Sequence, residues 1–280
     1  MTNIYLKLLC ILIASKLCES ACEDKWPSCG KYTNIVCERK ESCSGASGCT
    51  IMPLNEEFRR WYVEEHNRLR NEVATGKETR GGNAAAADMM TLSFDLELEY
   101  TAQCNVNLCT FKHDKCRRPK KFESAGQNLY TSTGKPLDTK DNVVNAIKNW
   151  YEEVQYTTEA ALTSYSSSTK TIGHYTQLVW AKSTHVGCAR AKKGNNYYLA
   201  CNYGIAGNLI GSPVYTKGTA CSKCPSGTAC NTHYKGLCGK IDEADIKKSP
   251  LKGGRISSSY IISLGVPFIL IIFKFMHFSC

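Results

Sequence analysis

Apolar positions recur with helical spacing in three stretches of the chain. The first runs from Leu54 to about Val73, the second from Asp95 to about Leu108, and the third from Asp141 to Tyr156. One broad face of the first stretch carries Leu54, Phe58, Trp61, Tyr62, Leu69 and Val73. Residues spaced in this way share one face of a helix, and Asp is a favourable N-cap. The pattern predicts three amphipathic helices, the second capped by Asp95.

Alternating apolar and polar positions mark a different kind of element further along the chain. Residues 186–191 and 197–203 alternate with period two around the polar stretch 192–196. This pattern predicts a β-hairpin with a five-residue loop. Cys188 and Cys201 can pair across its two strands or between neighbouring strands of the same sheet. A short strand is expected at 128–130, and helices mixed with strands indicate an α+β fold.

The cysteine content and the N-terminus point to an oxidising compartment. The chain of 280 residues holds 17 cysteines, far more than intracellular proteins usually carry. Lys7 precedes a short apolar core at 8–14, and a small-x-small pattern ends at Ser20. These features predict a signal peptide that is cleaved near Ser20. With Cys280 set aside, fourteen cysteines then remain between Cys22 and Cys238, an even number that permits complete pairing.

Two cysteine-rich segments flank the predicted helices and strands. The first holds five cysteines between Cys22 and Cys49 and is too short to build its own core. Its expected partners are Cys104, Cys109 and Cys116, although sequence alone does not fix the connectivity. The second segment contains Cys221, Cys224, Cys230 and Cys238. Two disulfides are favoured there over a zinc site, because the chain carries a secretory leader.

The formal net charge of +10 is partly concentrated in residues 112–121. Such a run can meet acidic glycans or anionic lipid headgroups, but a solvated surface loop is the commoner outcome. Nucleic acid is not an expected partner, because no helical or aromatic-interleaved reader accompanies the charge.

The C-terminal tail is apolar from Tyr260 to Phe278. A glycosylphosphatidylinositol (GPI) attachment signal is preferred there. A transmembrane anchor fits less well, because Pro267 and Lys274 interrupt the run, and a free tail would expose many apolar side chains. Attachment to a membrane through this tail is therefore an expectation.

Two motifs in the second half of the chain resemble a known signature pair. Gly173-His174-Tyr175-Thr176-Gln177-Leu178-Val179-Trp180 and the stretch from Tyr198 to Leu209 resemble the motifs of the CAP superfamily. This superfamily comprises cysteine-rich secretory proteins, antigen 5 and pathogenesis-related-1 proteins, and Ile205 departs from its usual residues at that position. The N-terminal cysteine cluster resembles the venom allergen 5-like branch of arthropods. The resemblance implies a three-layer α-β-α sandwich with small disulfide-rich extensions, and a bridge between Cys188 and Cys201.

The resemblance also implies a division of the chain. The expected parts are a signal peptide (1–20), a cysteine-rich N-terminal segment (21–52), a CAP domain (53–215), a small cysteine-rich knot (216–240), and a basic linker with an apolar tail (241–280).

In the family, two histidines and two acidic residues line a central cleft. Carried over to this chain, the histidines are His113 and His174 and one acidic residue is Glu153, whereas Gln127 stands at the other acidic position. Two imidazoles can hold a divalent cation such as zinc through neutral ring nitrogens. Glu153 can orient an imidazole or act as a base, but Gln127 cannot accept a proton. A structural polar cluster is favoured over an adventitious metal site, and both over a catalytic centre.

One further histidine, His66, lies within the first predicted helix. A packing or surface role is favoured for it over a role as a ligand.

The resemblance implies an extracellular, non-enzymatic protein with no required cofactor. The expected partner is a small apolar ligand, such as a sterol or a fatty acid, or an extracellular protein target. A metal-assisted hydrolase or protease that uses His113, His174 and Glu153 is the alternative. A third possibility is that the knot between Cys221 and Cys238 binds a channel or receptor. No G-x-S-x-G, H-E-x-x-H or phosphate-binding glycine loop is present in the sequence.

Overall fold

The computed structural model describes residues 5, 13, 16, 21–166 and 171–251. Most of the predicted signal peptide and the whole apolar tail lie outside these residues, as does the GPI signal. Among the described helices, none combines the length and the apolar character needed to cross a membrane.

A five-stranded sheet forms the middle of the molecule. Its strands are β1 (Thr50–Met52), β2 (Ser93–Phe94), β3 (Ala125–Thr133), β4 (His185–Lys193) and β5 (Asn196–Gly204). The order is β1-β4-β5-β3 with antiparallel neighbours, and β2 pairs with β4 in parallel. Within this order β3 is an edge strand, which becomes important for the cleft.

The predicted hairpin is present, but its predicted five-residue loop is wrong. Strand pairing continues to Lys193 and Asn196, so only Gly194 and Asn195 connect β4 to β5. Gly194 has a φ of +56°, and two-residue hairpin turns favour glycine because they need such backbone angles. The apolar alternation stops earlier, since the last paired residues are exposed and have no core to face.

The three predicted helices are present as α3 (Glu56–Ala74), α4 (Leu96–Val106) and α5 (Lys140–Tyr151). Asp95 caps α4 as predicted, because its carboxylate accepts a hydrogen bond from the Leu98 amide. The third helix is shorter than the predicted stretch from Asp141 to Tyr156, because α5 ends at Tyr151 and a 3₁₀ helix, η2 (Glu152–Tyr156), follows it.

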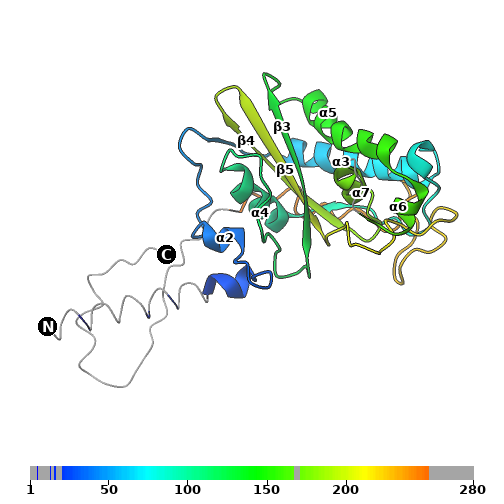
Figure 1. Ribbon diagram of the computed structural model, residues 1–280, viewed down its shortest axis with the longest axis horizontal. Helices are drawn as coiled ribbons and strands as arrows, with labels where there is room; N and C mark the ends of the chain where they lie inside the picture. The colour runs from blue at the N-terminus through cyan, green and yellow to red at the C-terminus, as the bar shows by residue number, and fades with distance from the viewer. Residues whose placement is uncertain (1–4, 6–12, 14–15, 17–20, 167–170, 252–280) are drawn as a thin grey trace.

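The shorter helical elements include α2 (Ile35–Glu38), η1 (Arg80–Gly82), α6 (Glu159–Thr163) and α7 (Gly173–Leu178). Helix α6 lies in a stretch rich in serine and threonine. Thr158 caps it by accepting a hydrogen bond from the Ala161 amide. Helices α3, α5 and α7 lie on one face of the sheet and α4 on the other (Figure 1). This arrangement confirms the α+β, three-layer α-β-α sandwich.

Small residues let α4 approach the sheet closely. A Cβ atom on Gly187 would lie 2.1 Å from the Glu99 amide nitrogen, so glycine is required there. Alanines fill the remaining contact: Ala102, Ala189, Ala191 and Ala200 are all fully buried. The larger core lies on the opposite face, where aromatic and branched side chains of α3, α5 and α7 pack.

Seven disulfides join the fourteen cysteines from Cys22 to Cys238. The N-terminal segment is bound to the core by Cys29–Cys116, Cys43–Cys104 and Cys49–Cys109, and Cys22–Cys37 closes it internally. Cys188–Cys201 crosses the hairpin, and Cys221–Cys230 and Cys224–Cys238 form the knot. The three expected core partners and the disulfide interpretation of the knot are therefore confirmed.

The segment after the knot packs against the domain in its first part. Ile246 is buried, and the buried guanidinium of Arg59 donates to the backbone oxygens of Asp245, Ile246 and Lys248. The same guanidinium forms an ion pair of 2.7 Å with Glu99. Residues 241–248, which the sequence placed in a basic linker, therefore cover part of α3 and α4.

The disulfides allow a test of how loop length sets stability. Cys29–Cys116 spans 87 positions, whereas Cys221–Cys230 spans 9. Because Cys43–Cys104 stays intact, the first bridge closes an effective loop of roughly 26 residues in the unfolded chain. We expect Cys29→Ala/Cys116→Ala to lower the free energy of unfolding by about 3.5 kcal/mol and Cys221→Ala/Cys230→Ala by about 2.5 kcal/mol, because the longer loop gains more entropy on unfolding. Chemical denaturation of both variants measures this difference. Equal losses would contradict the loop-length explanation.

Candidate functional site

His174 is held by a carboxylate that also caps its helix. Its Nδ1 lies 2.6 Å from Glu153 Oε1, while Glu153 Oε2 accepts from the amides of His174 and Tyr175 at 2.9 and 3.1 Å. The ring of Trp150 stacks on the imidazole, with 6.2 Å between centroids. Because Glu153 accepts the Nδ1 proton, the other ring nitrogen, Nε2, keeps its lone pair.

His113 is held in a loop that two disulfides anchor. The loop lies between Cys109 and Cys116, which pair with the N-terminal segment. His113 Nδ1 is 2.8 Å from Gln127 Oε1. Although the His113 side chain reaches solvent, partial desolvation lowers its pKa, and the charges of Arg117 and a protonated His174 lower it further. A lowered pKa keeps this imidazole neutral at neutral pH.

The neighbours of Gln127 fix which way its amide points. Its Nε2 donates to Asp114 Oδ2 at 2.8 Å and to Asn202 Oδ1 at 3.0 Å. A carboxylate such as Asp114 only accepts, so the amide nitrogen faces Asp114 and the amide oxygen faces His113. His113 must then donate through Nδ1, and its Nε2 also keeps a lone pair.

The two histidines reach the edge strand β3 from its opposite faces. Neighbouring residues on a strand point to opposite sides. Gln127 contacts His113 on the α4 side, and Asn128 donates to the backbone oxygen of His174 at 2.9 Å on the other side. All four predicted cleft residues therefore gather around this edge.

The arrangement suits cation binding better than proton transfer. An imidazole binds metal ions through the lone pair of a neutral ring nitrogen, and in both histidines Nδ1 has the acceptor partner that orients such a ligand and leaves Nε2 for the ion. Catalytic zinc sites usually have three protein ligands. Glu153 already accepts three hydrogen bonds, which hold its carboxylate in place.

The sequence did not single out Asp114 and Asn202, although they orient Gln127. Asp114 directly follows His113, and Asn202 lies opposite Gln127 in the β3–β5 register. Asp114 itself pairs with Arg117 at 2.7 Å. The only signal in the sequence was the position of Asp114 beside His113 and of Asn202 within the second signature motif.

His66 has the packing role that was favoured for it. It is fully buried, with Nδ1 2.7 Å from the backbone oxygen of Tyr62 and Nε2 2.9 Å from the Tyr203 hydroxyl. The carbonyl accepts the Nδ1 proton, so Nε2 must accept from Tyr203. Desolvation lowers the pKa of His66 to about 4, and the ring is therefore a neutral part of the core.

Beside α3 lies a groove of about 870 Å³, within the roughly 300–1,000 Å³ typical of small-molecule sites. We call it the α3–α5 groove, after the helices that form two of its walls; the knot and the segment after it form the rest. Its apolar lining consists of Trp61, Val63, Val144, Tyr234, Ile241 and Ile246. Lys140 and Lys240 also line it and form no ion pair with any described residue.

Comparisons with known proteins match this architecture. The model of the cysteine-rich secretory protein family, CAP, matches residues 63–203. The chain is similar to venom allergen-1 of Aedes albopictus, with 36% identity over 75% of this chain and 84% of the relative. It is also similar to a venom allergen 5 of Polybia paulista, with 40% identity over 68% of this chain and 96% of the relative. Among solved structures, NaASP2 with Zn²⁺ shares 34% identity with a TM-score of 0.58, and covers 66% of this chain and 97% of its own.

Burial of His66 makes the stability depend on pH. Its pKa is about 4 in the folded state and near 6.5 when unfolded, so the unfolded state binds more protons between these values. The free energy of unfolding should therefore fall by roughly 3 kcal/mol as the pH drops from 6.5 to 4 because of this residue. Urea denaturation of the parent and of His66→Gln across this range measures it. The exposed His233→Gln is the control, and a parental pH slope in His66→Gln would contradict the assignment.

Proposed function

Since the chain belongs to the CAP family of cysteine-rich secretory proteins and is venom allergen 5-like, we propose that it is an extracellular binding protein without catalytic turnover. Its disulfides suit an oxidising, extracellular environment. Its ligand is a small apolar molecule with an anionic end, such as a fatty acid. The α3–α5 groove is the observation that carries this proposal.

The lining of the groove suits such a ligand in two ways. Trp61 and Val144 are only partly buried. A chain of methylene groups that packs against them would be removed from contact with water, and this contributes a favourable free energy of roughly 25 cal/mol for each Å² of apolar surface buried. The unpaired ammonium groups of Lys140 and Lys240 can receive a carboxylate at the rim. Arg60 and Arg68 are less available, because each already pairs with two carboxylates.

The cleft contributes a divalent cation site to the same proposal. We assign its ligands to Nε2 of His113 and His174, with water in the other positions. Zinc is the natural candidate, because imidazole suits it and the similar NaASP2 was solved with Zn²⁺. With only two protein ligands, the ion would be held weakly and would not be required for folding.

The alternative of a metal-assisted hydrolase is less well supported. It needs a base beside the histidines, but Glu153 is occupied by the start of α7 and by His174. The second position carries the amide of Gln127, which cannot take up a proton. No contact around the cleft favours turnover over binding.

Filling the groove should remove lipid binding. We expect the parent to retain a labelled fatty acid and Val144→Trp to bind it at least about tenfold more weakly, a loss of about 1.4 kcal/mol. Ile51→Trp is the matched control, because Ile51 is exposed on β1 outside the groove. Lys140→Gln/Lys240→Gln should weaken fatty acid binding but leave sterol binding unchanged. Failure to bind any lipid class contradicts the function, and unaffected binding by Val144→Trp contradicts the location.

Zinc binding should depend on both cleft histidines. Calorimetric titration at neutral pH should show one weak site in the parent that is lost in His113→Ala and in His174→Ala, since each removes one of two ligands. His233→Ala should retain it, because His233 lies within the knot and does not contact either cleft histidine. A site that survives the loss of either cleft histidine contradicts the assignment.

A further inference from the structure

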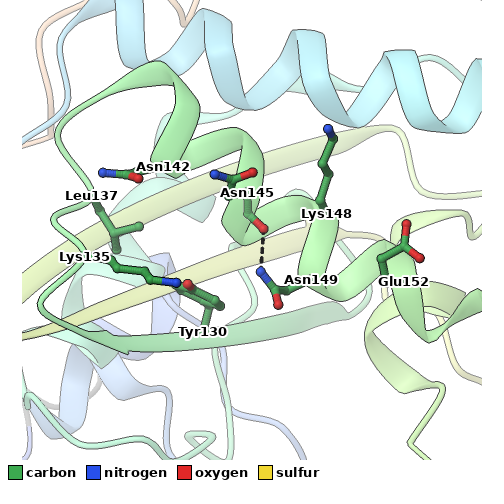
Figure 2. Close-up of a pocket in the computed structure, with 8 residues that line it drawn as sticks. All are labelled: Tyr130, Lys135, Leu137, Asn142, Asn145, Lys148, Asn149 and Glu152. Atoms are coloured by element: carbon green, nitrogen blue, oxygen red, sulfur yellow. Dashed lines mark hydrogen bonds between the residues drawn. The ribbon is translucent and has the colours of Figure 1, made fainter.

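A second cavity lies between α5 and the end of β3, and its lining is almost entirely polar. Its volume is about 230 Å³, smaller than the roughly 300–1,000 Å³ of sites for drug-sized molecules. Figure 2 shows that Asn142, Asn145 and Asn149 of α5 face it from one side and Tyr130 of β3 from the other. Lys135 and Lys148 also contribute to it. The shape and lining differ from those of the α3–α5 groove, so this cavity calls for a different ligand.

Hydrogen bonds within the protein determine which amide atoms remain for a ligand. Asn142 donates through Nδ2 to the Pro136 oxygen at 2.6 Å, and Asn149 donates to the backbone oxygen of Asn145 at 2.7 Å (Figure 2). Their side-chain oxygens therefore stay free as acceptors. The amide of Asn145 forms no hydrogen bond with the described residues and offers both a donor and an acceptor.

The cavity is positively charged. Glu152, the one carboxylate in the lining, is paired with Arg80 at 2.7 Å. Lys135 and Lys148 form no ion pair within the described part of the chain. In Figure 2 the side chain of Lys135 extends toward the ring of Tyr130, whereas Lys148 points away from it. Lys135 is therefore the cation placed to meet a ligand.

The free acceptors narrow the class of ligand. A bare sulfate ion has no donor for the oxygens of Asn142 and Asn149, and acceptors left without a donor oppose binding. Hydroxyl groups donate to such oxygens, and a negative group on the same molecule would meet Lys135. The ring of Tyr130 offers a flat apolar surface for carbon–hydrogen groups. We infer that this cavity binds one acidic sugar residue, a hexose that carries a carboxylate or a sulfate.

The inference is tested by titrating the full protein with glucuronic acid, glucose and inorganic sulfate, with calorimetry or ligand-observed NMR as the readout. Glucuronic acid should bind, and glucose should bind about tenfold more weakly, because it lacks the group that meets Lys135. Lys135→Gln should reduce the preference for the acid, and Asn145→Ala should weaken both sugars. Both residues are exposed, so the variants should fold, which thermal unfolding checks.

Lys192→Gln is the matched control for charge. Lys192 is exposed on the hairpin, and its substitution removes the same charge from a chain whose formal net charge is +10. It should leave glucuronic acid binding unchanged. The inference is overturned if glucuronic acid does not bind, if sulfate alone binds as tightly, or if Lys192→Gln weakens binding as much as Lys135→Gln. Lipid binding in the α3–α5 groove is measured separately and does not decide this result.

Discussion

The alternation of side chains along one edge strand brings the predicted cleft residues together. Gln127 and Asn128 are neighbours on β3, so their side chains lie on opposite faces of the sheet. One binds the imidazole of His113 and the other binds the backbone of His174. The loop of His113 and helix α7 with His174, which are about sixty residues apart in the sequence, thereby contact the same strand. Because β3 has no strand on its outer side within the described sheet, both imidazoles can approach its edge without displacing a neighbour.

Buried guanidinium groups then fix the irregular backbone around this edge. Arg70 is fully buried, and its pKa is lowered to about 9 by burial. Its donors bind the backbone oxygens of Met90, Leu178, Trp180, Ala181 and Ser183. Leu178 ends α7, the helix that carries His174, and Trp180, Ala181 and Ser183 follow it, whereas Met90 precedes β2. One buried guanidinium therefore joins two stretches of irregular backbone. Arg59 does the same for residues 245–248, which continue the segment that forms one wall of the α3–α5 groove.

Local patterns predicted the elements well, and long-range contacts were predicted only where chemistry restricted the choice. Helix α4 was predicted with its cap because Asp95 acts within one turn. The hairpin was predicted, but its turn was not, because exposed residues near Gly194 carry no alternation. Cysteines can pair only with cysteines, so the core partners of the N-terminal segment followed from a short list. The hydrogen bond from Gln127 to Asp114 was not predicted, since nothing in the sequence indicates the orientation of a side-chain amide.

The hydrogen bonds of Gln127 explain why an amide suits position 127 in this chain. Its nitrogen faces Asp114 and the oxygen of Asn202, which both act as acceptors there. A glutamate at this position would place a second negative group against Asp114 and would remove the donor that Asn202 Oδ1 accepts from. Asp114 cannot turn away, because Arg117 and Asn105 hold both of its oxygens. Gln127 therefore holds His113 so that its Nε2 is presented, and it places beside this histidine an amide, which cannot take up a proton.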